Sequence, residues 1–162
     1  MLRLPQAVGV TGPRLRDILG QPVFSMRTYR HPDDYAAVRS LWESIERGIH
    51  LGRSDTPEEI AKKVADQPDL FVVAEAGTQL IGAIMGGFDG RRGLLYHLAV
   101  SQAYRRNGIG SSLLHEIENR LRARGCLKCY LLVTTDNPEG IEYYLNRGWS
   151  PMNEVDLLGK EL

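Results

Sequence analysis

The sequence lacks several features that define whole classes of protein. Twenty lysine and arginine residues balance twenty acidic residues, so the formal net charge at pH 7 is zero. A surface without net charge argues against nucleic acid or an anionic membrane as the main partner, although it leaves room for a local basic patch. No apolar run in the sequence approaches the roughly 20 residues of a membrane-spanning helix. We therefore expect no membrane span and no nucleic-acid partner.

Cysteine is also scarce. Cys126 and Cys129 are the two cysteines of the chain, and they form a single C-x-x-C pair. A structural zinc site needs a second pair of ligands, and no histidines stand at a suitable spacing. A redox-active pair usually opens a helix, whereas these residues stand at the entry to an expected strand. The pattern predicts two structural thiols in a reducing cytoplasm, and no metal ligands.

The length and composition indicate one globular domain. The chain has 162 residues, of which 43% are hydrophobic and 25% are charged, as is usual for a single folded unit. Residues 1–22 lack the continuous apolar core and the cleavage site of a secretory signal peptide. We interpret residues 1–22 as an N-terminal arm and residues 23–162 as the domain, and we expect a cytoplasmic location.

Strand-like and helical patterns alternate along the domain. Thr56, Pro57 and Glu59 form a strong helix start, with Thr as N-cap, Pro at the first helical position and Glu at the third. Strands are expected at residues 24–30, 70–75, 79–88, 94–100 and 127–135 and within 149–158, and helices at 31–47, 56–67, 109–124 and 138–146. This order predicts an α/β (α+β) fold in which a mixed sheet carries helices on both faces.

The most informative stretch is Arg105–Ser111, which lies between an apolar strand pattern and a strongly periodic helix. The first amides of a helix have no partner within the helix and carry partial positive charge. Gly108 and Gly110 let a phosphate approach the backbone closely, and Arg105 and Arg106 add charge-assisted donors. The stretch therefore predicts a pyrophosphate site. Its spacing matches neither the nucleoside-triphosphate loop nor the dinucleotide fingerprint.

The pattern Arg105-x-x-Gly108-x-Gly110 resembles the acetyl-CoA signature of the GNAT N-acetyltransferase superfamily. A second stretch, Asn137–Trp149, resembles the next motif of that family, which ends in an aromatic-Tyr pair and then Gly-aromatic. One expected helix and one expected strand separate the two motifs, as in the family. The resemblance covers residues 26–162 and implies a GNAT-like, mostly antiparallel twisted sheet of six to seven strands.

Three further segments resemble a bacterial branch of YpeA-type acetyltransferases. They are Met85–Gly93, Arg124–Cys126 and the tail segment Leu158–Lys160. The resemblance implies acetyl-CoA as cosubstrate and a primary amine as acceptor, in a small molecule, an amino acid or a peptide. A homodimer is one assembly open to such a protein.

The resemblance also assigns roles to individual residues. It implies that the pantetheine arm of the coenzyme pairs with the strand that ends Leu98-Ala99-Val100. It implies that Asn137 holds this arm from the other side, although an N-cap role for Asn137 is equally open. Tyr144 matches the general acid that protonates the departing thiolate, and Tyr143 then faces the core. The pyrophosphate falls on Arg105, Arg106, Asn107, Gly108, Ile109, Gly110 and Ser111.

The sequence departs from the family pattern at the general base. The two positions where relatives carry a carboxylate or histidine correspond to Leu94 and Leu132, which cannot accept a proton. His97 is a candidate base, and a structural histidine or a water relayed to a backbone carbonyl are the alternatives. Strand alternation places Tyr96 and His97 on opposite faces. Acceptor specificity is expected from the first two helices and their loop, at Trp42, Glu43, Glu46, His50, Arg53 and Asp55.

Three functions compete at this stage. The first is an N-acetyltransferase in which the amine attacks acetyl-CoA directly within a ternary complex. The second is a GNAT-fold module that binds acetyl-CoA in a regulatory role or without catalysis. The absence of an obvious base slightly favours this module, and the presence of Tyr144 favours the enzyme. The third is a regulatory domain that binds adenine nucleotides at the Arg105–Ser111 loop. Fold alone does not separate them, because function depends on the site.

Overall fold

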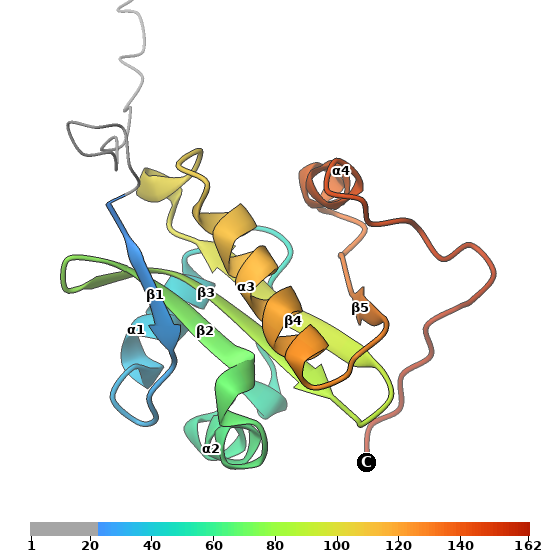
Figure 1. Ribbon diagram of the computed structural model, residues 1–162, viewed down its shortest axis with the longest axis horizontal. Coiled ribbons are helices and arrows are strands. Elements are labelled where there is room, and N and C mark those ends of the chain that lie inside the picture. The colour runs from blue at the N-terminus through green and yellow to red at the C-terminus, as the bar shows by residue number, and fades with distance from the viewer. Residues whose placement is uncertain (1–22) are drawn as a thin grey trace, which may run out of the picture.

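The computed structural model describes residues 23–162 as a sheet flanked by helices (Figure 1). The predicted arm, residues 1–22, lies outside the described residues. The strands are β1 (Ser25–Thr28), β2 (Phe71–Ala76), β3 (Gln79–Phe88), β4 (Gly93–Val100) and β5 (Cys129–Leu131). The α-helices are α1 (Tyr35–Glu43), α2 (Pro57–Asp66), α3 (Ile109–Ala123) and α4 (Pro138–Leu145). Short 3₁₀ turns lie at Arg53–Asp55, Pro68–Leu70 and Gln102–Tyr104.

The sheet is mixed and mostly antiparallel, as the sequence predicts. Its strand order is β1-β2-β3-β4-β5, and each of the first three pairings is antiparallel. The last strand, β5, runs parallel to β4. The predicted helices and strands up to β4 and α3 are present with shifts of a few residues at their ends, which is usual for boundaries.

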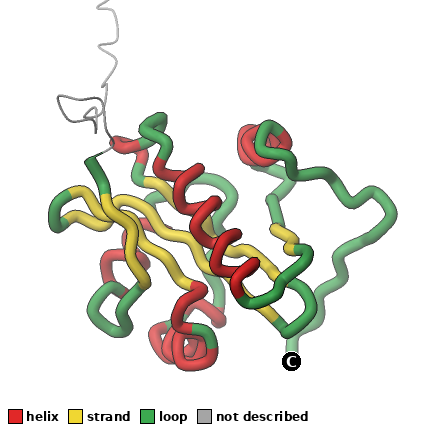
Figure 2. Tube along the Cα trace, in the orientation of Figure 1, coloured by secondary structure: helices red, strands yellow, loops and turns green. Residues whose placement is uncertain are grey.

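The predicted strand count of six to seven is wrong for the described part of the chain, where the sheet has five strands. Two expectations fail: β5 spans three residues instead of 127–135, and no strand forms within 149–158 (Figure 2). Pro151 has no amide hydrogen to donate to a ladder. Leu157 and Leu158 are 76% and 90% exposed, so the tail buries no face that would stabilise a strand.

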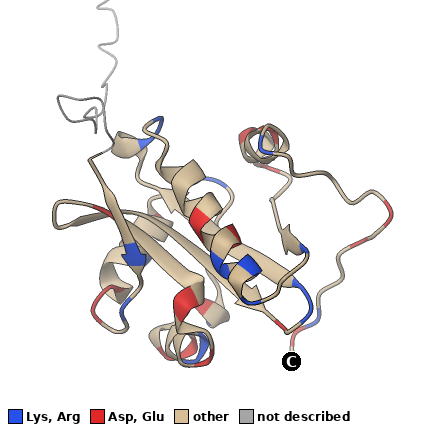
Figure 3. Ribbon diagram, in the orientation of Figure 1, with Lys and Arg blue, Asp and Glu red and all other residues tan. Residues whose placement is uncertain are grey.

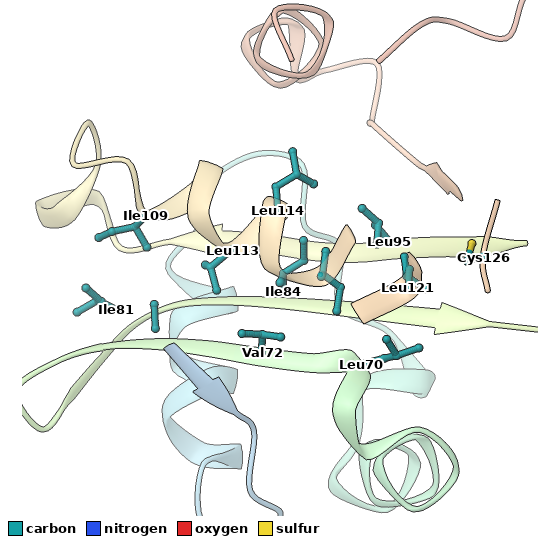
Figure 4. Packing of buried hydrophobic residues seen from close by; sticks show 12 residues of the cluster. Leu70, Val72, Ile81, Ile84, Leu95, Ile109, Leu113, Leu114, Leu121 and Cys126 are labelled. Carbon is teal, nitrogen blue, oxygen red and sulfur yellow. The ribbon is translucent and has the colours of Figure 1, made fainter. Parts of the chain in front are cut away.

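Two hydrophobic clusters lie on opposite faces of the sheet. On one face α3 packs against alternate residues of β2 and β3, including Val72 and Ile84 (Figure 4). On the other face α1 and α2 pack against the intervening residues, including Phe71 and Met85. The alternation of strand side chains produces this division, and it confirms the prediction of helices on both faces.

Close packing of α3 depends on two glycines in β3. A Cβ atom at Gly82 would lie 2.9 Å from Cδ1 of Leu113, and one at Gly86 would lie 3.1 Å from Cγ1 of Ile117. Leu113 and Ile117 are both fully buried on α3. The glycines therefore set how near α3 lies to the sheet, and this fixes the position of the α3 N-terminus.

The N-cap of α2 forms as predicted, and the two cysteines remain unpaired. Thr56 is the N-cap of α2, and its hydroxyl accepts a hydrogen bond from the Glu59 amide at 3.4 Å. Cys126 is buried, and burial raises the pKa of the Cys129 thiol to about 11. Both thiols are free. A thiol that stays protonated at neutral pH is unreactive, which supports a structural role.

None of the described helices is both long enough and apolar enough to cross a membrane. The described residues also contain no cluster of three or more His, Cys, Asp or Glu side chains able to hold a metal ion.

Candidate functional site

The site begins where β4 and β5 separate. The two strands pair from Gly93 to Leu95 on β4, and β5 then ends at Leu131. Beyond Leu95, β4 continues to Val100 and stays paired with β3 on its other side. Backbone groups on the β5 side of this segment therefore lose their ladder partners, and such groups readily pair with an added strand or ligand.

A β-bulge interrupts β4 within the same segment. Between Met85↔Tyr96 and Ala83↔Ala99 the register shifts, so β4 carries one extra residue there. His97 adopts a left-handed backbone conformation with φ of 47°. The extra residue breaks the strict alternation of the strand. The expectation that Tyr96 and His97 are separated on opposite faces is therefore wrong, and both line one small cavity.

Two adjoining spaces lie along the separated strands. The small cavity has a volume of about 60 Å³ and lies in the gap between β4 and β5. A groove of about 680 Å³ runs from there along β4 to the N-terminus of α3. Leu98, Asn137 and Tyr144 line both spaces, so the two adjoin at these residues. The groove brings together ten predicted coenzyme-binding residues: Leu98, Ala99, Val100, Arg105, Arg106, Gly108, Ile109, Gly110, Ser111 and Asn137.

The N-terminus of α3 opens into this groove. Gly108 is the N-cap residue with φ of 78°, a left-handed conformation that favours glycine. The first intrahelical bond runs from the Ser112 amide to the Gly108 carbonyl, so the preceding amides point out of the helix. Arg105 is anchored by a 3.3 Å hydrogen bond from Nε to the Val100 carbonyl. Basic residues in the loop that leads into α3 add to the positive field (Figure 3).

Asn107 is the predicted coenzyme residue that the structure places outside the groove lining. Its Nδ2 donates to the carbonyls of Tyr104 and Arg105, at 3.1 and 3.2 Å. These bonds hold the loop in shape ahead of α3. Asparagine commonly fills this role because its short amide reaches nearby backbone groups.

Tyr144 lies at the junction of the cavity and the groove. Burial raises its pKa to about 12. Its ring contacts Trp149 and Tyr143 edge-on, with centroids 6.1 and 5.2 Å apart. The phenol therefore stays protonated across the physiological pH range and is able to donate a proton or hydrogen bond into either space.

The sequence predicts that Tyr143 faces the core, and the structure corrects this expectation. Tyr143 lines the groove, and its hydroxyl lies 3.5 Å from Oγ of Ser111. A Cβ atom at Gly110 would lie 3.0 Å from the same hydroxyl, so Gly110 is also needed for the contact between α4 and α3. The two tyrosines thus line one groove from the same helix.

Arg147, which the sequence analysis missed, fastens α4 to α3. Its Nε and Nη2 donate to Oγ of Ser111 at 3.1 and 2.8 Å, and Nη1 donates to the Tyr143 carbonyl at 2.9 Å. The guanidinium also lies 3.6 Å above the Tyr143 ring. No local pattern reveals this role, because Ser111 is 36 residues away.

Asn137 is the N-cap of α4, as the N-cap alternative predicts. Its Oδ1 accepts a hydrogen bond from the Gly140 amide at 3.0 Å. Its side chain also packs against the loop after α1, where a Cβ atom at Gly48 would lie 2.5 Å from Asn137 Nδ2. Since Asn137 lines both spaces as well, one side chain caps α4, supports this loop and faces the site.

His97 is tied to the loop between α1 and α2. Its Nε2 lies 2.9 Å from Oδ1 of Asp55, and its ring meets Trp42 edge-on at 5.0 Å. The other Asp55 oxygen accepts from the Gly52 amide at 2.8 Å. Trp42 and Asp55, expected at the acceptor surface, are instead 1% and 5% exposed. Both side chains are buried and contact the His97 ring, so they hold it in place.

The remaining predicted specificity residues are exposed: Glu43, Glu46, His50 and Arg53. Arg53 pairs with Glu161 of the tail at 3.2 Å. Arg47, which the sequence analysis did not single out, lines both the cavity and the groove. A single basic residue in a polar loop carries no motif, so no sequence signal was available to find it.

A sheet that opens beside a helix N-terminus, with a groove between them, suits an extended ligand that carries phosphate groups. The model of the Acetyltransferase (GNAT) family matches residues 35–149 of the chain. An acetyltransferase of Sodalis glossinidius is 40% identical over 137 residues, which cover 85% of this chain and 94% of the relative. The chain belongs to the GNAT acetyltransferase family.

Solved structures agree with this fold. Ard1 from Thermoplasma volcanium superposes with a TM-score of 0.68 at 24% identity, covering 78% of this chain and 82% of Ard1. The PaiA N-acetyltransferase from Thermoplasma acidophilum, in complex with coenzyme A, superposes with a TM-score of 0.65 at 23% identity. This match covers 76% of this chain and 87% of PaiA. The chain is thus a member of a family whose acetyltransferases use acetyl-CoA.

Proposed function

We propose that the chain is an N-acetyltransferase that moves the acetyl group of acetyl-CoA to a primary amine by direct attack in a ternary complex. The observation that carries the proposal is that the groove and the small cavity adjoin, with Leu98, Asn137 and Tyr144 lining both. A two-substrate transfer needs one space for a long coenzyme and a second for the acceptor, meeting at the reacting atoms.

In this proposal the coenzyme lies in the groove. The pantetheine arm pairs with the β5 side of Leu98–Val100, where β4 has no strand partner. The pyrophosphate lies at the amides that open α3, with Arg105 and Arg106 beside it. Asn137 borders the arm from α4. The thioester then lies near Tyr144, at the mouth of the cavity.

The chemistry moves two protons. The amine nitrogen attacks the thioester carbonyl carbon, and the carbon–sulfur bond then breaks. Tyr144 gives its phenolic proton to the departing thiolate. His97 takes the proton that the amine loses, because histidine is the residue type that exchanges protons near neutral pH. Among the described cavity residues it is the one histidine, and Asp55 holds it in place.

Family and location complete the proposal. The three segments that resemble YpeA-type acetyltransferases favour that branch, in a cytoplasmic enzyme whose domain spans residues 23–162. The arm, residues 1–22, carries none of the motifs, so we expect its removal to leave coenzyme binding intact.

A thermal-shift measurement tests the coenzyme site. Acetyl-CoA should raise the Tm because it binds the folded chain alone. Gly108→Val should abolish the shift, since valine strongly disfavours the left-handed φ of 78° at the N-cap. Gly125→Val is the matched control: it changes another left-handed glycine, with φ of 83°, that lies away from the groove. A full shift in Gly108→Val would contradict the pyrophosphate assignment.

A further inference from the structure

The walls of the small cavity carry one fixed charge, and it is positive. Arg47 supplies this charge, and no aspartate or glutamate lines the cavity among the residues that the structure describes. Much of the remaining lining is aliphatic: Ile49, Ile84, Leu95, Leu98, Leu131, Leu132 and Val133. A site for a polycationic amine needs carboxylates to replace the water around each additional ammonium group. This lining provides none.

Arg47 stands in the loop that follows α1, where it borders the cavity and the groove together. Its side chain is exposed. No side-chain hydrogen bond or ion pair holds it within the described part of the chain. The exposed carboxylate of Asp136 lies within electrostatic reach, but water and salt screen a surface pair of this kind. The guanidinium is thus available to an anionic group on a ligand.

The small volume limits how far that anionic group is from the amine. A space of about 60 Å³ admits an amino group and a few further atoms. Because Arg47 forms part of the same wall, an anion bound there lies only a few bonds from the reacting nitrogen. The aliphatic lining, including Ile49 and Leu132, suits an apolar side chain on the same molecule.

We propose that the acceptor is an α-amino acid with an apolar side chain, whose carboxylate pairs with Arg47 while its amine enters the cavity. This assignment rests on the proposed transferase function and specifies its acceptor. It makes Arg47 a specificity residue, with a bidentate donor set that matches a carboxylate. Diamines and polyamines fit this cavity less well, because its described lining holds no carboxylate for a second ammonium group.

Acceptors that differ in charge test the proposal. Thiol release from acetyl-CoA is measured with leucine, leucinamide, 3-methylbutylamine and spermidine at one pH. Leucine should show the highest kcat/KM. The comparison between leucine and leucinamide works against the proposal. The amine of leucinamide is less basic, so a larger fraction of it is in the reactive free form.

Variants at Arg47 test whether this residue determines the preference for leucine. Arg47→Gln should lower kcat/KM for leucine by about 10- to 100-fold, the usual loss for a charged hydrogen bond, and leave leucinamide nearly unchanged. Arg47→Lys should keep part of the preference because it keeps the charge. Arg91→Gln is the matched control, since Arg91 is exposed in the turn between β3 and β4 and lines neither the cavity nor the groove.

Several results would overturn the assignment. One is a preference for spermidine or leucinamide, and another is an equal effect of Arg47→Gln on every acceptor. A higher Kd for acetyl-CoA in Arg47→Gln, with acceptor preference unchanged, would assign Arg47 to the coenzyme instead. If acetyl-CoA raises the Tm but leucine is not acetylated, the acceptor class is wrong and the coenzyme site stands. If acetyl-CoA does not bind at all, the proposed function itself fails.

Discussion

The carboxylate of Asp55 lies 2.9 Å from Nε2 of His97, and this contact joins the loop between α1 and α2 to the bulge in β4. An ionised carboxylate only accepts hydrogen bonds, so Nε2 carries the proton in the pair. The lone pair of a neutral imidazole then lies on Nδ1. Asp55 is itself held by the Gly52 amide, and the Tyr35 hydroxyl donates to its backbone carbonyl at 2.8 Å. Two hydrogen bonds therefore hold Asp55, and Asp55 in turn fixes the orientation of the His97 ring.

Replacing His97 tests whether it is the base. His97→Gln should lower kcat/KM by about 10²- to 10⁴-fold, the usual contribution of a general base, and remove the acidic limb of the pH profile. Asp55→Asn should cause a smaller loss, because an asparagine amide presents either a donor or an acceptor to Nε2 and so fixes the ring less strictly. His115→Gln, exposed on α3, is the control. A limb that persists in His97→Gln and follows the amine's own titration would show that no protein base is needed.

Tyr144→Phe should lower kcat and leave the Kd for acetyl-CoA nearly unchanged. A lost general acid costs about 10²- to 10⁴-fold, and the lower end is expected because a thiolate leaves readily. Since burial raises the pKa of Tyr144 to about 12, its deprotonation should produce no basic limb below that pH. Tyr130→Phe, on β5, is the matched control. Turnover unaffected by Tyr144→Phe would remove this residue from the mechanism.

Arg105→Ala should weaken acetyl-CoA binding by about 1–3 kcal/mol, and the loss should shrink as salt is added. Arg105 is braced by its bond to the Val100 carbonyl, whereas the neighbouring Arg106 lines the same groove. Arg106→Ala should therefore have the smaller effect. Calorimetric titration at two ionic strengths measures both. Negligible losses in both variants would leave the α3 amides as the main anchor.

Gly48→Ala should destabilise the fold and disturb the cavity. The new Cβ would lie 2.5 Å from Asn137 Nδ2, at a backbone φ of 88° that alanine rarely adopts. We expect a loss of about 1–3 kcal/mol in the free energy of unfolding, as for other strained backbone positions. Gly52→Ala is the control in the same loop, because its φ is −137° and no atom lies within 4 Å of its Cβ position. Equal stability of the two variants in urea would contradict the close packing of Gly48 on Asn137.

Asp34 should make stability fall in acid. The Arg27 guanidinium, at 2.6 Å, holds the pKa of this carboxyl below its ordinary 3.8, and the Arg30 amide adds a second bond. A lowered folded-state pKa stabilises the fold above pH 3.8, and this contribution is lost as pH falls further. Asp34→Asn should therefore flatten the stability curve in that window, as measured by denaturant titration. Asp33→Asn, at the exposed neighbour, should leave the slope intact.

Elements stabilised by contacts between near neighbours were predictable from the sequence alone. The cap of α2 by Thr56, the cap of α4 by Asn137 and the glycine start of α3 each depend on residues within one helical turn. The same is true of the loop that carries Arg105, whose local motif points to the family that the comparisons show and predicts an anion site. Apolar periodicity likewise predicted which face of α3 is buried.

What only the tertiary structure decided depends on residues far apart in the chain. His97 meets Asp55 across 42 residues, and Arg147 meets Ser111 across 36. Register shifts and strand ends are decided by how neighbouring strands pair, so neither the bulge at His97 nor the early end of β5 follows from its own residues. Propensity acts over a few residues, whereas Arg47 and Tyr143 come to line the groove through packing of separate elements. No local energy term specifies which side chains meet there.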